Sequence, residues 1–231
     1  MPNYRTIVFD LDGTLTDPTQ EMISSASYAL EQFGIKETDP ERLKLFTQVP
    51  LLHCFEEHFG LSQAQTDQAF IHYWYYAGIF GVKKNVPYEG IPSLLAKLHE
   101  KGTTLCIATA RKTKNAEQIL KTCNLDGYFA FVFGASEDET RRTKKMILFD
   151  LLCELPEYSS EDTLMVGDRV VDLSGAQDNG IDSMAVTYGQ ETVEDLSRTN
   201  PTYMVNNVKE MAGILLDEKS PEGVPETSKR D

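Results

Sequence analysis

The sequence predicts an α/β protein built on a doubly wound parallel sheet, with an all-helical unit inserted after the first strand. Three observations indicate this fold. Short apolar, β-branched runs recur along the chain and are apolar continuously, which is typical of strands buried on both faces of a parallel sheet. From about residue 90 onward, amphipathic stretches separate these runs, an alternation typical of βα units. After the first run, by contrast, a long interval contains helical patterns and no convincing strand.

Six apolar runs are the predicted strands, the last of them at an edge of the sheet: Thr6–Phe9, Thr104–Ala108, Phe129–Phe133, Thr163–Val166, Ser183–Val186 and Tyr203–Val205. Amphipathic stretches predict helices between them at Ile91–Lys101, Lys114–Cys123 and Lys144–Glu154. Pro92 is compatible with this assignment because the first turn of a helix tolerates proline. These elements together predict a Rossmann-like core.

The interval between Pro18 and Val86 carries four helical patterns, at Gln20–Phe33, Glu41–Phe46, Leu52–Phe59 and Gln63–Ala77. Glycines and prolines separate these patterns, as they do between helices. We therefore expect a Rossmann-like core at residues 1–17 and 87–216 and a helical domain at residues 18–86. Residues 217–231 are polar and contain proline and glycine, which predicts a disordered tail.

The charge balance narrows the range of partners. Asp and Glu total 36 against 22 Lys and Arg, a formal net charge of -14. Such a surface repels a polyphosphate backbone, so a nucleic-acid polymer is not expected as a partner, whereas a small phosphorylated molecule is compatible with a local cation. The chain shows no leader and no apolar run of about 18 residues, so we expect a cytoplasmic protein without a membrane partner. The four dispersed cysteines are expected to be buried, reduced thiols.

Two acidic residues follow the first strand, in the segment Asp10-Leu11-Asp12-Gly13-Thr14. Ligands of open parallel sheets bind beyond the carboxyl ends of the strands, so both carboxylates are placed where chemistry is expected. Neighbouring carboxylates repel each other, which lets one act as an ionised nucleophile while the other carries a proton. An ordinary Asp-Gly turn at the end of a strand is the alternative interpretation.

Three further strand ends carry polar residues. Thr109-Ala110-Arg111 follows the second run, where a hydroxyl and backbone N–H groups could hold phosphoryl oxygens or Thr109 could simply cap a helix. Lys144 and Lys145 begin a helix, where a cation is electrostatically unfavourable without an anionic partner, although solvated surface charge would also explain them.

The fourth run ends in Gly167-Asp168, with Asp172 one helical turn further along. Acidic residues that converge from two strand ends form an all-oxygen site of the kind that Mg²⁺ prefers. An N-cap role is the alternative for Asp168 alone. All the simpler interpretations would have to hold at four successive strand ends, which makes a shared site the better hypothesis.

These four segments resemble the motifs of the haloacid dehalogenase superfamily. The segment from Asp10 to Thr14 resembles the first motif, Thr109 the second, Lys144 the third, and Gly167-Asp168 with Asp172 the fourth. The resemblance covers residues from about 4 to 210 and is strongest to the phosphoglycolate phosphatase-like and 5′-nucleotidase-like branch. The segments Val49-Pro50-Leu51 and Tyr88-Glu89-Gly90-Ile91 are similar to that branch.

The resemblance implies a Mg²⁺-dependent phosphatase acting on a small phosphorylated metabolite. Asp10 would be the nucleophile and Asp12 the proton donor and acceptor, while Thr109 and Lys144 bind the phosphoryl group. The implied metal ligands are Asp10, the backbone carbonyl of Asp12, Asp168 and Asp172.

The segment Thr109-Ala110-Arg111 differs from the Thr-Ser-Lys common in relatives, so Ala110 and Arg111 are expected at the substrate. We prefer Lys144 to Lys145 as the phosphate-binding lysine. This choice puts the lysine in phase with the apolar residues that should form the buried face of its helix: Ile147, Leu148, Leu151 and Leu152.

The helical insertion resembles a cap domain, so specificity is expected within residues 18–86. Aromatic side chains there could line a pocket, although helical spacing favours core positions: His53, Phe55, Tyr73, Trp74 and Tyr76. A phosphomutase of the β-phosphoglucomutase kind and a non-catalytic binding protein remain alternatives. A dehalogenase would not need the proton of Asp12, and a phosphonatase would need a distinctive lysine in the cap. The sequence does not indicate the oligomeric state.

Overall fold

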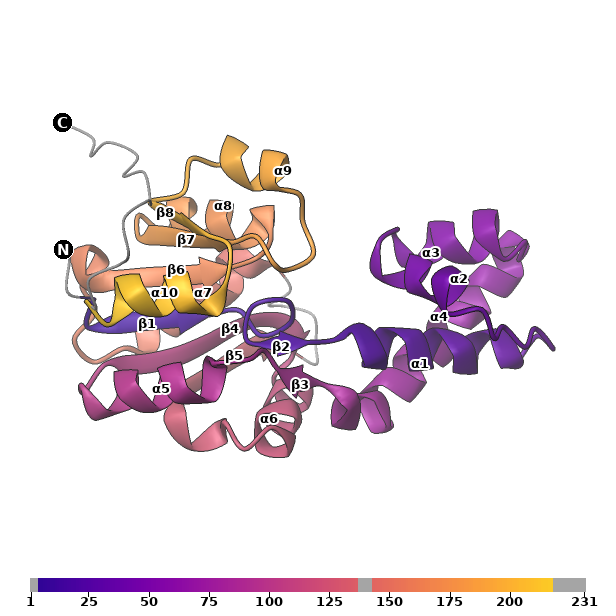
Figure 1. Ribbon diagram of the computed structural model, residues 1–231, viewed down its shortest axis with the longest axis horizontal. Coiled ribbons are helices and arrows are strands. Elements are labelled where there is room, and N and C mark those ends of the chain that lie inside the picture. The colour runs from indigo at the N-terminus through magenta and orange to yellow at the C-terminus, as the bar shows by residue number, and fades with distance from the viewer. Residues whose placement is uncertain (1–3, 137–142, 218–231) are drawn as a thin grey trace. The chain divides into compact units, whose positions relative to one another are not determined.

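The computed structural model describes residues 4–136 and 143–217 (Figure 1). The tail predicted at 217–231 therefore lies outside the described residues, except for Asp217. The chain divides into two compact units, one comprising Met1–Thr16 and Pro87–Asp231 and the other Asp17–Val86. Each unit is described by itself.

A six-stranded sheet forms the centre of the larger unit, in the order β5-β4-β1-β6-β7-β8. Its strands are β1 (Thr6–Phe9), β4 (Thr104–Lys112), β5 (Phe131–Ala135), β6 (Thr163–Gly167), β7 (Asp182–Val186) and β8 (Tyr203–Val205). All neighbouring pairs are parallel, and β1 pairs with β4 on one side and β6 on the other. The predicted α/β fold with a parallel sheet is confirmed. The strand order reverses at β1, and ligands of such sheets bind at the point of reversal.

Helices flank this sheet (Figure 1): α5 (Ile91–Glu100), α6 (Thr113–Thr122), α7 (Lys144–Glu154), α8 (Val170–Asp178), α9 (Val193–Arg198) and α10 (Val208–Leu215), with 3₁₀ helices η4 (Asp126–Tyr128) and η5 (Ser160–Asp162). A buried apolar cluster joins side chains of β1, β4 and β6 to α7 and α8; it includes Val8, Cys106, Ala108, Met165, Ile147, Leu148, Leu151, Leu152 and Ala176. The core thus packs the three central strands against α7 and α8.

Helix α7 shows how the sequence fixes an element of the site. Thr143 caps it, because its hydroxyl oxygen accepts a hydrogen bond from the N–H of Met146 at 3.3 Å. The predicted buried face is present, since Lys144, Ile147, Leu148, Leu151 and Leu152 are the buried residues of the helix. Lys144 therefore points inward with the apolar residues.

Two strands of the six-stranded sheet differ from the sequence prediction by more than one residue. β4 continues to Lys112 instead of ending at Ala108, and β5 begins at Phe131, after η4, instead of at Phe129. The register between β4 and β5 shifts, since Ala108 lies opposite Phe133 whereas Lys112 lies opposite Ala135. Four residues on β4 thus span two on β5, and such an irregularity redirects side chains at the end of a strand. Thr109 lies in this irregular segment and does not cap α6, which begins at Thr113.

The smaller unit is helical, with α1 (Thr19–Glu31), α2 (Pro40–Lys44), η1 (Leu45–Thr47), α3 (Leu51–His53), the π-helical segment η2 (Cys54–His58), α4 (Gln63–Ile79) and η3 (Gly81–Lys84). It has its own buried core: Ala26, Ala29, Leu30, Phe46, Cys54, Phe55, Leu61, Ala69, Tyr73 and Ala77. Two short strands, β2 (Thr16–Asp17) and β3 (Val86–Pro87), pair where the chain passes into and out of this unit.

The aromatic residues singled out in this unit have different surroundings. Phe55 and Tyr73 belong to the core, whereas Trp74 is half exposed and His53 is exposed. Tyr76 stacks on Tyr28 with the ring centroids 4.9 Å apart. The structure therefore removes Phe55 and Tyr73 from the residues that could contact a ligand.

Two expectations from the composition concern the cysteines and membrane-spanning helices. Cys54 and Cys106 are buried and free, but Cys153 is exposed and Cys123 is partly exposed, so the expectation of buried thiols is wrong for Cys153. Cys153 lies outside the buried face of α7, because it is out of helical phase with Ile147, Leu148 and Leu151. Among the described residues, no helix combines the length and the apolar character needed to cross a lipid bilayer.

The buried core around α7 leads to a first testable prediction. Leu148 is fully buried, so Leu148→Ala should lower the free energy of unfolding by about 2–5 kcal/mol through lost burial and an unfilled cavity. Chemical denaturation measures this loss. The adjacent Phe149 is 58% exposed, so Phe149→Ala should change the same quantity by less than about 1 kcal/mol. Equal losses in the two variants would contradict the assigned face of α7.

Candidate active site

The loop after β1 brings Asp10 to the centre of the sheet edge. The N–H of Asp10 still donates to the carbonyl of Val166 on β6 at 2.9 Å, so its backbone is part of the sheet. The chain then turns tightly, because the N–H groups of Leu15 and Thr16 both donate to the carbonyl of Leu11 at 2.9 Å. Gly13 has φ +83°, a conformation that side chains disfavour. This turn holds Asp10 nearly fully buried.

Three buried carboxylates converge at this edge. Asp10, Asp168 and Asp172 each have an oxygen within 4.8 Å of the others. Burial, followed by repulsion from Asp10 and Asp172, raises the pKa of Asp168 to about 8. Burial also raises the pKa of Asp172 to about 6, even though the positive charge of Lys144 favours the ionised carboxylate. The cluster is therefore under electrostatic stress, which a cation would relieve.

Lys144 lies between two of these carboxylates. Its Nζ is 2.7 Å from Oδ1 of Asp10 and 2.8 Å from Oδ1 of Asp172, and it donates to the carbonyl of Ala108 at 2.6 Å. Burial alone would lower the pKa of Lys144, but the two carboxylates outweigh it and raise the pKa above its ordinary value. Lys145 is exposed and pairs with Asp178 at 3.2 Å. Only Lys144 of the tandem pair thus contacts the acidic cluster.

Asp12 has a different partner. The guanidinium of Arg111 donates to both of its carboxylate oxygens, from Nη2 to Oδ1 at 2.9 Å and from Nε to Oδ2. Both side chains are partly buried. Thr109 is buried, and its hydroxyl oxygen accepts from the N–H of Arg111 at 3.3 Å. The irregular end of β4 therefore joins the loop after β1 through an Arg–carboxylate pair.

The predicted site residues thus fall into two groups. Asp10, Asp168 and Asp172 form one cluster and Lys144 contacts two of them, whereas the side chain of Asp12 binds Arg111 instead of joining the cluster. Thr109 lies at the neighbouring strand end, and Ala110 is exposed. Asp168 is not an N-cap, because α8 begins at Val170 after Arg169.

Sequence reasoning assigned no role to two groups that bind Asp168. The hydroxyl of Thr14 donates to Oδ1 of Asp168 at 3.1 Å, and the N–H of Gln190 donates to Oδ2 at 2.8 Å. Thr14 lies in the first motif, so its position was a usable signal. Gln190 binds through its backbone N–H, which every residue except proline has, so its residue type does not predict the contact.

The residues present fit a divalent metal ion. The three carboxylates offer an all-oxygen donor set, which suits hard cations. Oδ1 of Asp172 is fully buried and faces the ammonium of Lys144 at 2.8 Å. Its neighbour Oδ2 accepts from the N–H of Arg169 at 3.1 Å, which holds the carboxylate in place. Asp172 is therefore anchored through Oδ2, while Oδ1 faces the charged cluster, as expected of a carboxylate that helps to hold a metal ion.

Comparison with known proteins finds one family model and several relatives that match most of this chain. A family model described as haloacid dehalogenase-like hydrolase matches residues 7–186. A 5′-nucleotidase of Pseudomonas aeruginosa is 35% identical over 92% of this chain and 96% of its own length. Tyrosine-protein kinase PtkA of Mycobacterium tuberculosis is 30% identical over 90% of this chain and 72% of its own. The crystal structure of a provisionally assigned phosphatase from Clostridium difficile superposes with a TM-score of 0.86 at 37% identity, covering 93% of this chain and all of the other.

The raised pKa values predict how stability depends on pH and metal. In the unfolded chain, Asp168 and Asp172 ionise near pH 4, whereas in the metal-free fold they ionise at about pH 8 and about pH 6. Each is thus harder to ionise when folded, and the cluster makes the metal-free protein less stable as pH rises from about 4 to 8. A divalent cation needs the ionised form, so the stabilisation by Mg²⁺ should grow over the same range.

Melting temperatures measured with EDTA and with Mg²⁺ across this pH range test the effect. At a Mg²⁺ concentration roughly 100 times Kd and about pH 8, we expect a rise of about 5–10 °C. The rise should shrink toward pH 5. Asp168→Asn should abolish it, and a shift independent of pH would rule out the cluster as the binding site.

Proposed function

The chain belongs to the haloacid dehalogenase-like hydrolases, and we propose that it is a Mg²⁺-dependent phosphatase that hydrolyses a small phosphomonoester through an aspartyl-phosphate on Asp10. One observation carries the proposal: Asp10 is buried with its Oδ1 against Lys144, in a cluster with Asp168 and Asp172. A carboxylate beside a lysine and a metal-binding pair suits attack on an anionic phosphorus centre.

Asp10, Asp168 and Asp172 would hold Mg²⁺ with the backbone carbonyl of Asp12. Bound there, the cation would neutralise negative charge on the transferring phosphoryl group and on the attacking carboxylate. The remaining steps depend on the side chains of the protein.

An oxygen of Asp10 would attack phosphorus and form the acyl-phosphate bond while the bond from phosphorus to the ester oxygen breaks. Asp12, protonated once its carboxylate has left Arg111, would give its proton to that departing oxygen, which leaves as an alcohol. Asp12 would then take a proton from water, whose oxygen attacks phosphorus and displaces the carboxylate of Asp10. Inorganic phosphate is released, and both aspartates return to their starting states.

The phosphoryl oxygens need donors that are already in position. Lys144 lies within hydrogen-bond distance of Asp10 and is held by the carbonyl of Ala108, which makes it the best-placed cation. The buried hydroxyl of Thr109 is the second donor that we assign. Such groups act because they are fixed before the charge develops, so no reorganisation is required during the reaction.

The substrate is proposed to be a nucleoside monophosphate or phosphoglycolate, of which the 35%-identical 5′-nucleotidase favours the former. We assign recognition of the leaving group to residues 18–86 and to Arg111, whose guanidinium already binds a carboxylate. A panel of phosphate esters ranked by kcat/KM would separate the two substrates. Appearance of a sugar-phosphate isomer in place of free phosphate would instead indicate a phosphomutase.

Replacing the nucleophile tests the mechanism. Asp10→Asn should lower kcat for an aryl phosphate ester by at least about a thousandfold, because an amide cannot form the phosphoenzyme. Phosphate release with Mg²⁺ measures this loss. Asp126→Asn, at an exposed aspartate of the same unit, should retain full activity. Full activity in Asp10→Asn would refute the proposal.

The tandem lysines provide a second test with a built-in control. Lys144→Ala should lower kcat by about 10²–10³-fold, the usual effect of removing one prearranged charge-stabilising donor. Lys145→Ala should stay within about twofold of the wild type, because its side chain is exposed and pairs with Asp178. A melting curve for each variant establishes that it is folded. The opposite ranking would assign the phosphate-binding role to Lys145.

A further inference from the structure

The segment Tyr188-Gly189-Gln190, which follows β7, takes no part in the chemistry described above but contacts both strand-end loops of the site. We call these three residues the strap. At one end, the N–H of Gln190 donates to Oδ2 of Asp168 at 2.8 Å. At the other end, the hydroxyl of Tyr188 donates to the backbone carbonyl of Thr14 at 2.8 Å. The strap thus connects Asp168 with the loop that carries Asp10.

Thr14 closes the connection into a ring of contacts. Its carbonyl accepts from Tyr188, while its own hydroxyl donates to Oδ1 of Asp168 at 3.1 Å. Each oxygen of Asp168 therefore has one fixed donor, from Thr14 on one side and from Gln190 on the other. Two fixed donors set the rotation of the carboxylate plane, and with it the direction in which the remaining lone pairs point.

Close packing fixes the position of the same carboxylate. A Cβ atom added to Gly189 would overlap the side chain of Asp168, and so would one added to Gly13. Asp168 therefore lies between two glycines, one in the strap and one in the loop after β1. Neither position has room for any side chain unless Asp168 moves.

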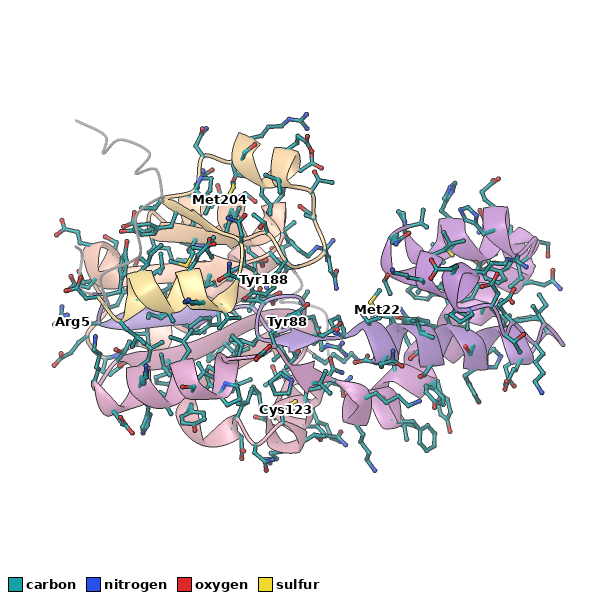
Figure 2. The ribbon with its side chains drawn as sticks, viewed as in Figure 1. Arg5, Met22, Tyr88, Cys123, Tyr188 and Met204 are labelled. Atoms are coloured by element: carbon teal, nitrogen blue, oxygen red, sulfur yellow. The ribbon has the colours of Figure 1, made fainter. Side chains whose placement is uncertain are left out.

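The ring of Tyr188 is itself held in place. It packs against Tyr88 in an edge-to-face arrangement with the centroids 4.9 Å apart, and Figure 2 shows the two labelled residues side by side. The backbone of Tyr88 is anchored as well, since its N–H donates to the carbonyl of Leu15 at 3.0 Å. The hydroxyl of Tyr188 consequently approaches Thr14 from a fixed direction, as a positioning group requires.

We propose that Tyr188 is a positioning residue for the metal site, which orients Asp168 and the loop after β1 through Thr14. The inference rests on the proposed function in that it assigns Asp168 to a divalent cation. Loss of the hydroxyl leaves the carbonyl of the buried Thr14 without this donor and frees the loop that presents Asp10 and the carbonyl of Asp12. The affinity for the cation then falls, because groups behind metal ligands contribute strongly to binding.

Tyr188→Phe tests the inference because it removes the hydroxyl and keeps the ring against Tyr88. Titration calorimetry with Mg²⁺ alone should give a Kd about three- to tenfold higher than the wild type, within the range of one hydrogen bond. Gly189→Ala should raise the Kd by about tenfold or more. Melting temperatures in EDTA show whether each variant is folded.

Tyr158→Phe is the matched control. The hydroxyl of Tyr158 also donates to a backbone carbonyl, that of Asn179 at 3.5 Å, but far along the chain from the strap and at an exposed position. This variant should bind Mg²⁺ like the wild type. A purely structural role for Tyr188 would lower the melting temperature in EDTA and leave the Kd for Mg²⁺ unchanged, and that result would overturn the inference.

The outcome is separable from that of the proposed function. Binding of Mg²⁺ is measured without any substrate, so the strap can be tested even if the wild type releases no phosphate. Conversely, a wild type that hydrolyses phosphate esters while Tyr188→Phe keeps the full affinity for Mg²⁺ would leave the proposed function intact and refute the role of the strap.

Discussion

The structure depends on burying several like charges at one edge of a sheet. In the part of the chain that the structure describes, Asp10, Asp168 and Asp172 lie together with Lys144, so this group carries two net negative charges when all four side chains are ionised. Two unit charges 4 Å apart interact with about 4 kcal/mol at an effective dielectric constant of 20. A few such repulsions approach the whole stability of a domain, about 5–15 kcal/mol. Lys144 offsets part of this repulsion, and a divalent cation matches the charge that remains.

The surrounding fold reflects this constraint. Carboxylates that repel each other stay together only if rigid groups hold them, and each of the three has such a support. Asp10 is attached through its backbone to β6, Asp172 accepts from an N–H at the start of α8, and Asp168 is held between two hydrogen-bond donors. Glycines at 13 and 189 let the neighbouring backbones approach close enough to do so. The parallel sheet supplies the common edge from which these loops emerge.

The features that could be predicted from the sequence are those that depend on a local pattern of residues. Continuous apolar runs gave the strands, and helical phase distinguished Lys144 from Lys145, because a residue in register with four buried apolar residues must point inward. The irregular end of β4 was missed because it arises from pairing with β5, which no local pattern encodes. The contact of Gln190 was missed for a different reason: a backbone N–H is present whatever the residue type. Local patterns therefore predict which residues approach the site, while long-range pairing determines how they are held.

The pairing of Asp12 with Arg111 gives two aspartates only two positions apart different partners. Here Asp10 contacts Lys144, whereas Asp12 turns to the end of β4 and contacts Arg111. Because a guanidinium favours the ionised form of a carboxylate, the proposed role of Asp12 as proton shuttle requires its carboxylate to leave Arg111 during the reaction. Arginine suits this position better than lysine, because its planar fork binds both oxygens of one carboxylate and leaves Lys144 as the cation beside Asp10. A guanidinium that binds the carboxylate of Asp12 can also bind an anionic group of a substrate. The residue that departs from the common motif is therefore the one through which the chain could select its substrate.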